Sequence, residues 1–592
     1  MRALGYKTVD ALVDWLNDPA ALPLRRATRA EMVARLAGLE PVAGSFDDAL
    51  RVLFDDVLPF SSRAAHPRFF AYVPFAGTWP GALGDFIASA CNVYAGSWQE
   101  SAGPSQLELE ILDWFKEWVG YPPAAGGSLV SGGSVANLTA LACAREARVG
   151  AMRDDIVVYV SDQVHSSIGR GARMLGFRPD QLRILQANDG QQLEPETLAA
   201  AFAADEAAGR LPFLAVANAG ATSTGAVDPV AELAALCAER NVWLHVDAAY
   251  GGFAVVTDRG RAALGELSAA DSITLDPHKW LYQPYECGCL LVRDGGALRR
   301  AFEIRSDYLR DAHAAAEELN FADYGIQLTR TSRAFKLWLS LRTFGIDAFR
   351  DAIDRTLDLA ELARRRIEES DAFELAAPPS LGIVCFRRRD ADDEQTDGLV
   401  AALEGSGVGL ISSTRVHGHS ALRLCILNHT TQAEDVERVL EFLESAKPDG
   451  VPAEYERHPQ VPTTVPLFAR LDPREAAALA ALSTERRIPA GEPIVSRWDT
   501  TRDLYVLEEG VVEVLFEDEL VATVRPGDYF GEIAALEWGA GFARSRAATV
   551  VARENARVRV LAPNALEQLL EEFPRLATEI RRTAHDRLRG LR

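Results

Sequence analysis

Asp276-Pro277-His278-Lys279-Trp280 is the stretch from which the fold and chemistry of this chain can be read outward. The lysine amine can form a Schiff base with an aldehyde cofactor. Thirty-two positions before it, His245-Val246-Asp247-Ala248-Ala249-Tyr250-Gly251-Gly252 supplies a carboxylate that can hold a pyridine nitrogen protonated. A His-Lys pair by itself is usually a solvated surface pair. Together, the two stretches predict pyridoxal 5'-phosphate as the cofactor.

Short apolar runs alternate with helical stretches on both sides of these motifs. Strands separated by helices indicate an α/β fold, with a mostly parallel sheet covered on both faces. Ligands of such sheets bind at the carboxyl ends of the strands, where both motifs lie. The predicted strands are 156–160, 213–217, 242–246, 272–275 and 289–292, with a crossover helix at 230–239.

The 592 residues are too many for one compact core, so we expect several domains. Five prolines between 448 and 466 can continue neither a helix nor a central strand, which predicts a linker. Short β runs punctuated by glycine follow it and are typical of a jelly roll. The predicted parts are a helical segment at 1–60, a large cofactor-binding α/β domain at 61–370, a small α+β subdomain at 371–446, the linker at 447–466 and an all-β domain at 467–592.

The amino-acid composition narrows the classes of protein to which this chain can belong. The chain is 48% hydrophobic and 25% charged, as in globular proteins, and its net charge of −23 disfavours nucleic acids and anionic membranes as partners. Seven cysteines without dense spacing are typical of a reducing cytoplasm. No apolar run approaches the ~20 residues of a membrane helix. Cys287 and Cys289 lack a second cysteine pair nearby, so we expect no metal site.

Three further motifs lie at predicted strand ends. Ser131-Gly132-Gly133-Ser134 precedes a helix, and backbone N–H groups at a helix start can cradle a phosphate. His165 follows the strand at 156–160 and could lie on a conjugated ring, while Thr222 could reach a ring substituent. The Gly-rich turn alone fits a plain strand-to-helix turn equally well, and a lone histidine is more often a structural residue.

In their order along the chain, the motifs resemble those of the pyridoxal-phosphate-dependent group II amino acid decarboxylases, which include the aromatic L-amino acid decarboxylases. The resemblance runs from about Leu4 to about Leu443. It implies an aspartate aminotransferase-like fold (fold type I) and a homodimer with active sites at the subunit interface. The matching motifs are His66–Tyr72, Ser131–Asn137, Asp162–Ser167, His245–Gly252 and Asp276–Trp280.

The resemblance also implies a role for individual residues. Lys279 would attach the cofactor, Asp247 would pair with the pyridine nitrogen, and His165 and Ala249 would pack against the two faces of the ring. Thr222 would contact the ring edge. The implied phosphate ligands are Gly133, Ser134 and His278, and the implied substrate-side residues are Tyr72, Phe75 and Phe321.

The mobile catalytic loop departs from the family pattern. Alignment backwards from Arg330 places Phe321 where the proton-donating tyrosine is expected. A phenyl ring cannot donate a proton, and in related enzymes this substitution accompanies oxidative deamination to an aldehyde. Tyr324 and Tyr308 are the nearest tyrosines, and Tyr324 is our predicted catalytic donor. We therefore expect decarboxylation of an L-amino acid to its amine, with aldehyde synthesis as the alternative.

The last part of the chain resembles a cyclic-nucleotide-binding domain. Pro526–Ala534 and Ser545–Val550 carry the resemblance. It implies that Glu532 binds the ribose 2′-hydroxyl and Arg546 the cyclic phosphate, a pairing that suits a guanidinium. The chain after 562 is too short for a helix-turn-helix, so we expect regulation by a nucleotide rather than DNA binding. The alternative is a non-enzymatic nucleotide-sensing or scaffold protein. Backbone contacts from Gly531, Ile533 and Ala534 are implied, and Ala547 favours cAMP over cGMP.

Overall fold

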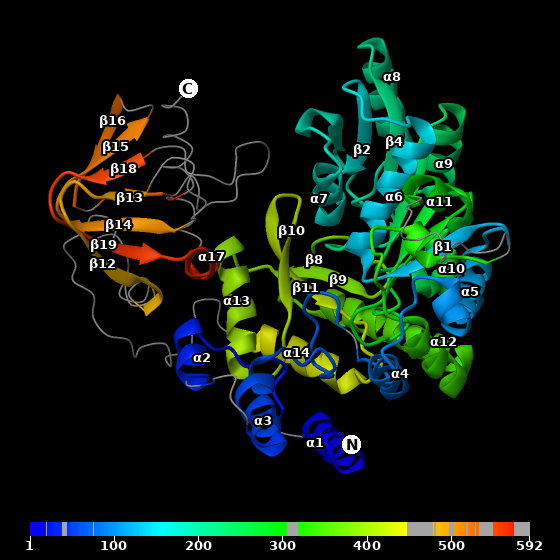
Figure 1. Cartoon of the computed structure of the whole chain (residues 1–592), viewed down its shortest axis with the longest axis horizontal. Helices are drawn as coiled ribbons and strands as arrows, with labels where there is room; N and C mark the ends of the chain where they lie inside the picture. The colour runs from blue at the N-terminus through cyan, green and yellow to red at the C-terminus, as the bar shows by residue number, and fades with distance from the viewer. Residues whose placement is uncertain are drawn as a thin grey trace. The chain divides into compact units, whose positions relative to one another are not determined.

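The structure, a computed structural model, describes residues 1–18, 21–37, 39, 44–74, 76–304, 318–446, 478, 481–495, 503–516, 519–526, 528–531, 549–573 and 580. The chain divides into two units, residues 1–450 and 451–592, which we describe separately (Figure 1). Several predictions fall outside the described residues. These concern the linker at 447–466 and the residues Phe75, Tyr308, Glu532, Ile533, Ala534, Arg546 and Ala547.

A seven-stranded sheet forms the centre of the first unit, in the order β1-β7-β6-β5-β4-β2-β3. Strand β7 runs antiparallel to β1 and β6, and the other neighbours are parallel. All five predicted strands are present, as is the predicted helix α9 (Val230–Glu239). The strands are β1 (Gly126–Val130), β2 (Ile156–Ser161), β3 (Leu182–Leu185), β4 (Leu211–Asn218), β5 (Trp243–Ala248), β6 (Ser272–Leu275) and β7 (Gly288–Val292).

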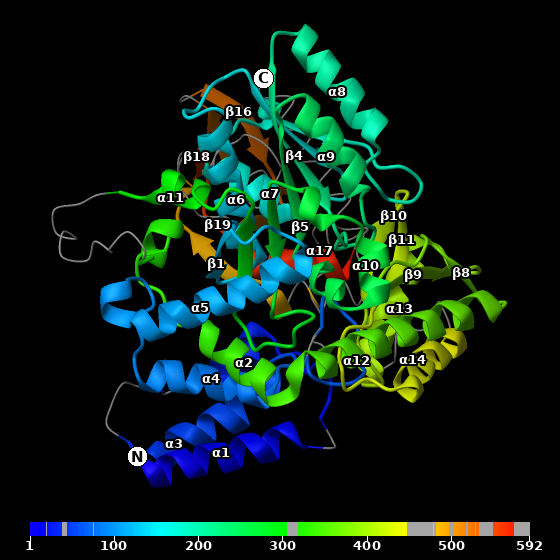
Figure 2. The same ribbon diagram turned by 90° about the vertical axis from the view of Figure 1, so that its right-hand side faces the viewer.

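Apolar side chains cover both faces of this sheet, as a buried parallel sheet requires. Val157 and Tyr159 of β2 pack in one core with helices α5, α8 and α9, while Val158 and Val160 pack in a second core with α6, α7 and α11. Figure 2 shows helices on both sides of the strands. The helices are α5 (Trp98–Val119), α6 (Gly133–Arg148), α7 (Ser166–Met174), α8 (Pro195–Ala207), α10 (Asp258–Leu264) and α11 (Ala297–Phe302).

A smaller α+β layer follows the long helix α12 (Ala334–Glu369). Its four antiparallel strands have the order β10-β11-β9-β8, and α12, α13 and α14 pack with them around a separate apolar core. The elements are β8 (Phe373–Leu375), β9 (Ile383–Arg388), α13 (Asp393–Ser406), β10 (Ser412–Val416), β11 (His419–Cys425) and α14 (Ala433–Ser445).

The N-terminal helices bury little of their surface. None of the residues in α1 (Arg2–Leu16), α2 (Arg29–Arg35) or α3 (Phe46–Arg51) is buried. Helix α4 (Trp79–Ala90) packs on α12 but leaves Phe86 62% exposed. These helices therefore carry apolar surface that the single chain does not cover.

The second unit contains two four-stranded antiparallel sheets, as predicted for an all-β domain. Their orders are β12-β19-β14-β17 and β13-β18-β15-β16, and helix α17 (Pro563–Glu572) follows. The strands are β12 (Thr484–Ile488), β13 (Pro493–Val495), β14 (Leu504–Glu509), β15 (Val512–Phe516), β16 (Glu519–Val524), β17 (Tyr529–Phe530), β18 (Thr549–Ala552) and β19 (Ala556–Leu561).

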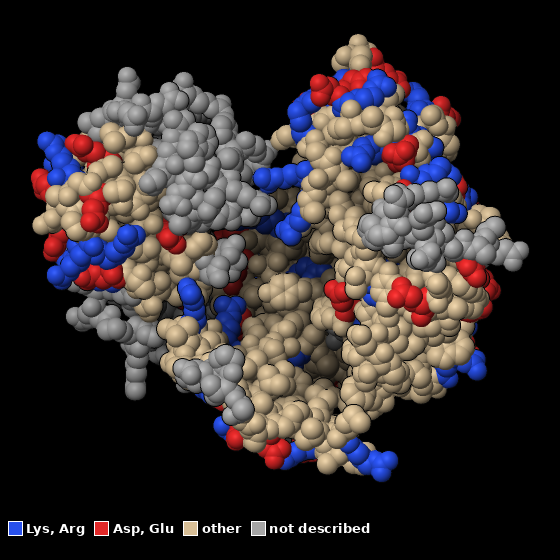
Figure 3. Space-filling view, in the orientation of Figure 1, with Lys and Arg blue, Asp and Glu red and all other residues tan. Residues whose placement is uncertain are grey.

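Basic and acidic side chains are interspersed on the face of the molecule shown in Figure 3. Within the described ranges, no helix combines the length and the apolar character that a membrane crossing requires. Among the same residues, no cluster of three or more His, Cys, Asp or Glu side chains could hold a metal ion.

Candidate active site

A cavity of about 340 Å³ lies at the carboxyl ends of the parallel strands in the first unit. It brings together all eight residues that the sequence assigned to the cofactor, which come from five separate segments. They are Gly133, Ser134, His165, Thr222, Asp247, Ala249, His278 and Lys279.

The turn between β1 and α6 forms one wall of the cavity. Helix α6 begins at Gly133, so its first N–H groups and its positive dipole end face an incoming anion. A Cβ on Gly133 would lie 2.9 Å from Asp276 Oδ2 and 3.1 Å from Ala249 Cβ. Such contacts are too close, and this position therefore requires glycine to keep the cradle open.

Lys279 lies opposite this turn, where its Nζ is 3.0 Å from Asp276 Oδ2. The other carboxylate oxygen of Asp276 is buried and has no hydrogen-bond partner. An amine beside an incompletely satisfied carboxylate and an open anion cradle fits an aldehyde cofactor that carries a phosphate.

Asp247 is the fifth residue of β5 and is 7% exposed. Its Oδ2 accepts a hydrogen bond from Asn137 Nδ2 at 2.8 Å, and its Oδ1 accepts one from the Ala249 backbone at 3.1 Å. The strand holds the carboxylate at the cavity wall, where it suits a protonated pyridine nitrogen.

His165 caps the start of α7 and lines the same cavity. Burial lowers the pKa of His165, and the nearby Lys279 lowers it further, while Asp247 acts in the opposite direction. A neutral imidazole results near neutral pH, which suits a ring that packs against a cofactor.

Three residues at this site were missed by the sequence analysis. Asn137 and Asp276 lie within the motifs Ser131–Asn137 and Asp276–Trp280, but an asparagine or an aspartate by itself does not indicate a role at a cofactor site. Arg423 comes from β11, and its buried guanidinium donates to the carbonyl oxygens of Thr222, Ser223 and Tyr72 at 2.7, 3.0 and 2.5 Å. It therefore ties the small subdomain to the cavity.

Among the described residues, three that were predicted for the substrate side or the catalytic loop do not line this cavity: Tyr72, Phe321 and Tyr324. Tyr72 is 71% exposed, with a positive φ of 54°. Phe321 is 1% exposed, and its ring centroid lies 4.9 Å from the Arg330 guanidinium carbon. Tyr324 packs on Phe321, with ring centroids 6.1 Å apart. The roles assigned to these three residues stay predictions.

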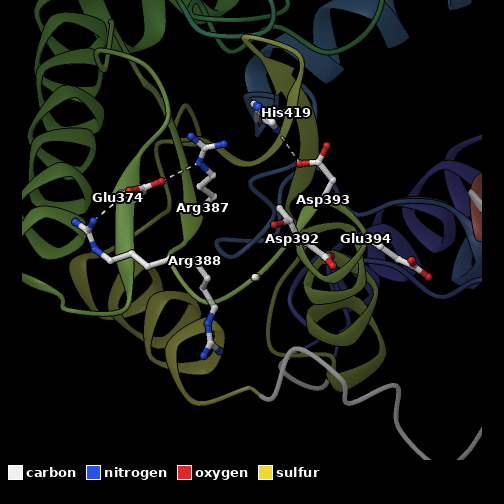
Figure 4. Close-up of a pocket in the computed structure, with 10 residues that line it drawn as sticks. Glu374, Arg387, Arg388, Asp392, Asp393, Glu394 and His419 are labelled. Carbon is white, nitrogen blue, oxygen red and sulfur yellow. Dashed lines mark hydrogen bonds and ion pairs between the residues drawn. The ribbon is translucent and has the colours of Figure 1, made fainter.

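A larger cavity of about 600 Å³ lies in the small subdomain (Figure 4). Arg387 and Arg389 both pair with Glu374, which lies between arginine side chains, and His419 is 3.6 Å from Asp393. The charged side chains of this cavity pair with one another, which makes it a weaker candidate for a catalytic site than the smaller cavity.

Comparison with known proteins identifies the first unit. Residues 44–389 match the pyridoxal-dependent decarboxylase conserved domain. The chain belongs to this decarboxylase family. The decarboxylase is thus an enzyme that depends on pyridoxal phosphate, and its fold is fold type I. Residues 485–573 match the cyclic nucleotide-binding domain, so this decarboxylase carries a second functional module.

Individual relatives agree with this assignment. An aromatic-L-amino-acid decarboxylase of Bacillus atrophaeus is 37% identical, over 74% of this chain and 94% of the relative. A phenylacetaldehyde synthase of Arabidopsis thaliana is 29% identical, over 75% and 95%. The crystal structure of Oryza sativa TDC with PLP and tryptamine has a TM-score of 0.71 at 29% identity, covering 75% of the decarboxylase and 96% of that chain.

We expect His245, two residues before Asp247, to make the decarboxylase sensitive to acid. This side chain is fully buried, and burial lowers its pKa from 6.5 to about 4. The unfolded chain thus binds the proton more tightly than the folded chain, so stability is present above pH 6.5 and is lost as the pH falls through 4. The expected loss is about 3 kcal/mol.

Urea unfolding at several pH values measures this effect. His245→Gln removes the titrating group, so its free energy of unfolding should fall less steeply over the same interval. Equal slopes in both proteins would contradict the assignment to His245.

Proposed function

We propose that the protein decarboxylates an aromatic L-amino acid to its amine, and that a cyclic nucleotide bound to the second module regulates the reaction. The observation that carries the proposal is the single cavity in which Lys279, Asp247, His165 and the Gly133 turn converge. The aromatic substrate is supported by the name of the Bacillus relative and by the tryptamine in the Oryza structure.

Each residue of the cavity then has a task. Pyridoxal phosphate, when bound, supplies an electron sink for the charge left on the α-carbon after carbon dioxide departs. Lys279 would provide the amine that attaches the cofactor, and Asp247 would hold the proton on the pyridine nitrogen by charge pairing. His165 and Ala249 would pack against the ring, and Thr222 would contact it. The phosphate would be held by Gly133, Ser134 and His278.

Release of carbon dioxide from each of the twenty amino acids, from hydroxylated aromatic amino acids and from cysteine sulfinate tests the substrate. Activity confined to tryptophan, tyrosine, phenylalanine or their hydroxylated forms agrees with the proposal. Faster reaction with glutamate or cysteine sulfinate would contradict it.

The amine is favoured over the aldehyde because the aldehyde alternative depends on Phe321. That side chain is buried under the Arg330 guanidinium, where it serves packing. Tyr324 shares this environment, and burial raises the pKa of its hydroxyl. The Tyr324 hydroxyl therefore keeps its proton at neutral pH, as a proton donor must, and Tyr324 stays our proposed donor with Tyr308 as the alternative.

Tyr324→Phe is expected to lower amine formation by roughly 10²-fold, because a general acid contributes at least this much. Chromatography of amine, aldehyde and hydrogen peroxide measures the change, and the aldehyde fraction should rise. Tyr308→Phe is the matched comparison for the alternative donor and should retain the amine. Aldehyde as the main product of the unmodified enzyme would overturn this proposal.

We also infer that the enzyme is a homodimer. The unburied helices α1 to α3 and the exposed Phe86 of α4 offer apolar surface that a second copy can cover. Light scattering of the purified protein tests this directly, and a particle with the mass of one chain would contradict it.

All seven cysteines are free, which supports a reducing, cytoplasmic location.

Regulation requires that the nucleotide bind active and inactive conformations with different affinity, since only that difference shifts their populations. We expect cAMP, rather than cGMP, to change the decarboxylation rate. Arg546→Ala should weaken nucleotide binding by at least ~10-fold, because it removes a charge-assisted bond to the phosphate.

Calorimetry for binding and a rate assay for coupling separate the two parts of this prediction. Arg553→Ala is the matched control, because Arg553 is a 62% exposed arginine of the same unit. Binding without any change in rate would refute regulation while leaving the nucleotide site intact.

A further inference from the structure

A chain of buried hydrogen bonds runs behind the candidate active site, from β5 and β6 to α6. Trp243 Nε1 donates to Ser272 Oγ at 2.9 Å, and Ser272 Oγ lies 2.8 Å from His245 Nδ1. His245 Nε2 is 3.0 Å from Asn137 Oδ1. Asn137 Nδ2 then donates to Asp247 Oδ2 at 2.8 Å.

The chemistry of its two ends fixes the direction of every bond in this chain. The Trp243 indole can only donate, and the ionised Asp247 carboxylate can only accept. Asn137 must therefore turn its NH₂ group toward Asp247 and its carbonyl oxygen toward His245. His245, which burial keeps neutral, must carry its proton on Nε2 and accept from Ser272 at Nδ1.

A branch of the same chain reaches His165. Asn137 Nδ2 also donates to Ser167 Oγ, at 2.8 Å. The Ser167 hydroxyl lies 2.8 Å from His165 Nδ1 and donates its hydrogen to it, because a nitrogen that accepts the Ser167 backbone N–H carries no proton of its own. The Ser167 backbone N–H points to the same nitrogen, at 3.3 Å. Two donors at Nδ1 leave Nε2 as the protonated nitrogen of His165.

We propose that Asn137, held by His245, is a positioning residue that orients the Asp247 carboxylate and keeps His165 neutral with its proton on Nε2. The inference deepens the proposed function, since it rests on Asp247 and His165 serving the cofactor. Its consequence is that His165 Nε2 carries an N–H donor, rather than a lone pair, at the cavity that this residue lines.

Other charged groups also act on His165, and they come from three elements. Arg170 lies on α7, Asp247 on β5, and Asp276 and Lys279 follow β6. Asp247 and Asp276 favour the imidazolium form, while Lys279 and Arg170 oppose it. Burial lowers the pKa of His165 more than any of these charges shifts it, and because the charges oppose one another, the two donors at Nδ1 add to the preference for the neutral form.

Nitrogen NMR of the cofactor-loaded protein labelled in histidine tests the assignment without relying on activity. His165→Gln identifies the signals of this ring. We expect an unprotonated Nδ1 and a protonated Nε2 near neutral pH. A protonated Nδ1 in the unmodified protein overturns the proposal, whether or not any amino acid is decarboxylated.

Variants at His245 test the positioning role. His245→Leu leaves the Asn137 carbonyl oxygen without its donor, so the amide is held less firmly and the Ser167 hydroxyl is freer to turn and accept from a protonated His165 Nδ1. The pH at which kcat falls on the acid side of its pH profile should then rise by about half a unit or more. His245→Gln keeps a donor for Asn137 and should restore the original pH.

Thr274→Val is the control, because Thr274 Oγ1 lies 3.4 Å from His245 Nε2 but outside the chain of bonds. Thermal unfolding shows that each variant is folded. A uniform loss of kcat in His245→Leu, with no shift of that acid-side pH, would reduce His245 to a packing residue and overturn its role.

Discussion

Replacing Lys279 with alanine is expected to lower kcat by roughly 10⁴-fold or more, because this change removes both the covalent attachment of the cofactor and a positioned amine. The chain has five lysines, and only Lys279 lines the cavity among those the structure describes. Lys116 and Lys336 hold backbone carbonyl oxygens elsewhere. Carbon dioxide release measures the rate, and the visible absorption of the bound cofactor measures attachment.

A covalent label sharpens this test. Reduction of the loaded enzyme with borohydride should fix the cofactor to one peptide, the one containing Lys279, and mass spectrometry identifies it. Lys7→Ala, a half-exposed lysine, is the control and should label as the unmodified enzyme does. An intact protein that binds no cofactor and releases no carbon dioxide would favour the alternative of a nucleotide-sensing scaffold.

Local signals explain why so much of the site could be predicted from the sequence. The cofactor residues follow strands, and parallel strands with crossover helices bring their carboxyl ends to one edge. Short motifs at five strand ends therefore meet in space without any knowledge of distant contacts. The helix at 230–239 was predictable for the same reason, because its apolar spacing is contained within ten residues.

The features that could not be predicted from the sequence depend on contacts between segments far apart in the chain. Arg423 reaches Thr222 across 201 positions, and nothing in its neighbourhood on β11 marks it for this site. Phe321 was assigned by counting from Arg330, and its ring lies against the guanidinium of that arginine, so its role on the substrate side stays a prediction. The alignment that assigned Phe321 depends on the length of the loop before Arg330. Hydrophobic periodicity in the sequence carries no information on loop length. The antiparallel direction of β7 likewise depends on its pairing with β1 and β6.

Asp247→Ala is expected to lower kcat by roughly 10³-fold, comparable to the loss of a preorganised electrostatic contact in a buried site. The physical reason is that an uncharged pyridine nitrogen withdraws less electron density from the α-carbon, so the charge left by carbon dioxide departure is less stabilised. Cofactor attachment at Lys279 should persist, which separates this effect from that of Lys279→Ala.

A modified cofactor can show that the charge, rather than the side chain's shape, is responsible. Pyridoxal phosphate methylated at the ring nitrogen carries a permanent positive charge and needs no carboxylate to keep it. It should restore much of kcat in Asp247→Ala and give no gain in the unmodified enzyme. Asp228→Asn is the matched control, because this buried carboxyl binds the backbone of Leu193 and Asn218 and lies outside the cavity lining. Failure of the methylated cofactor to rescue a folded, loaded Asp247→Ala would mean that Asp247 acts through geometry, together with the Asn137 amide that holds it, and not through its charge.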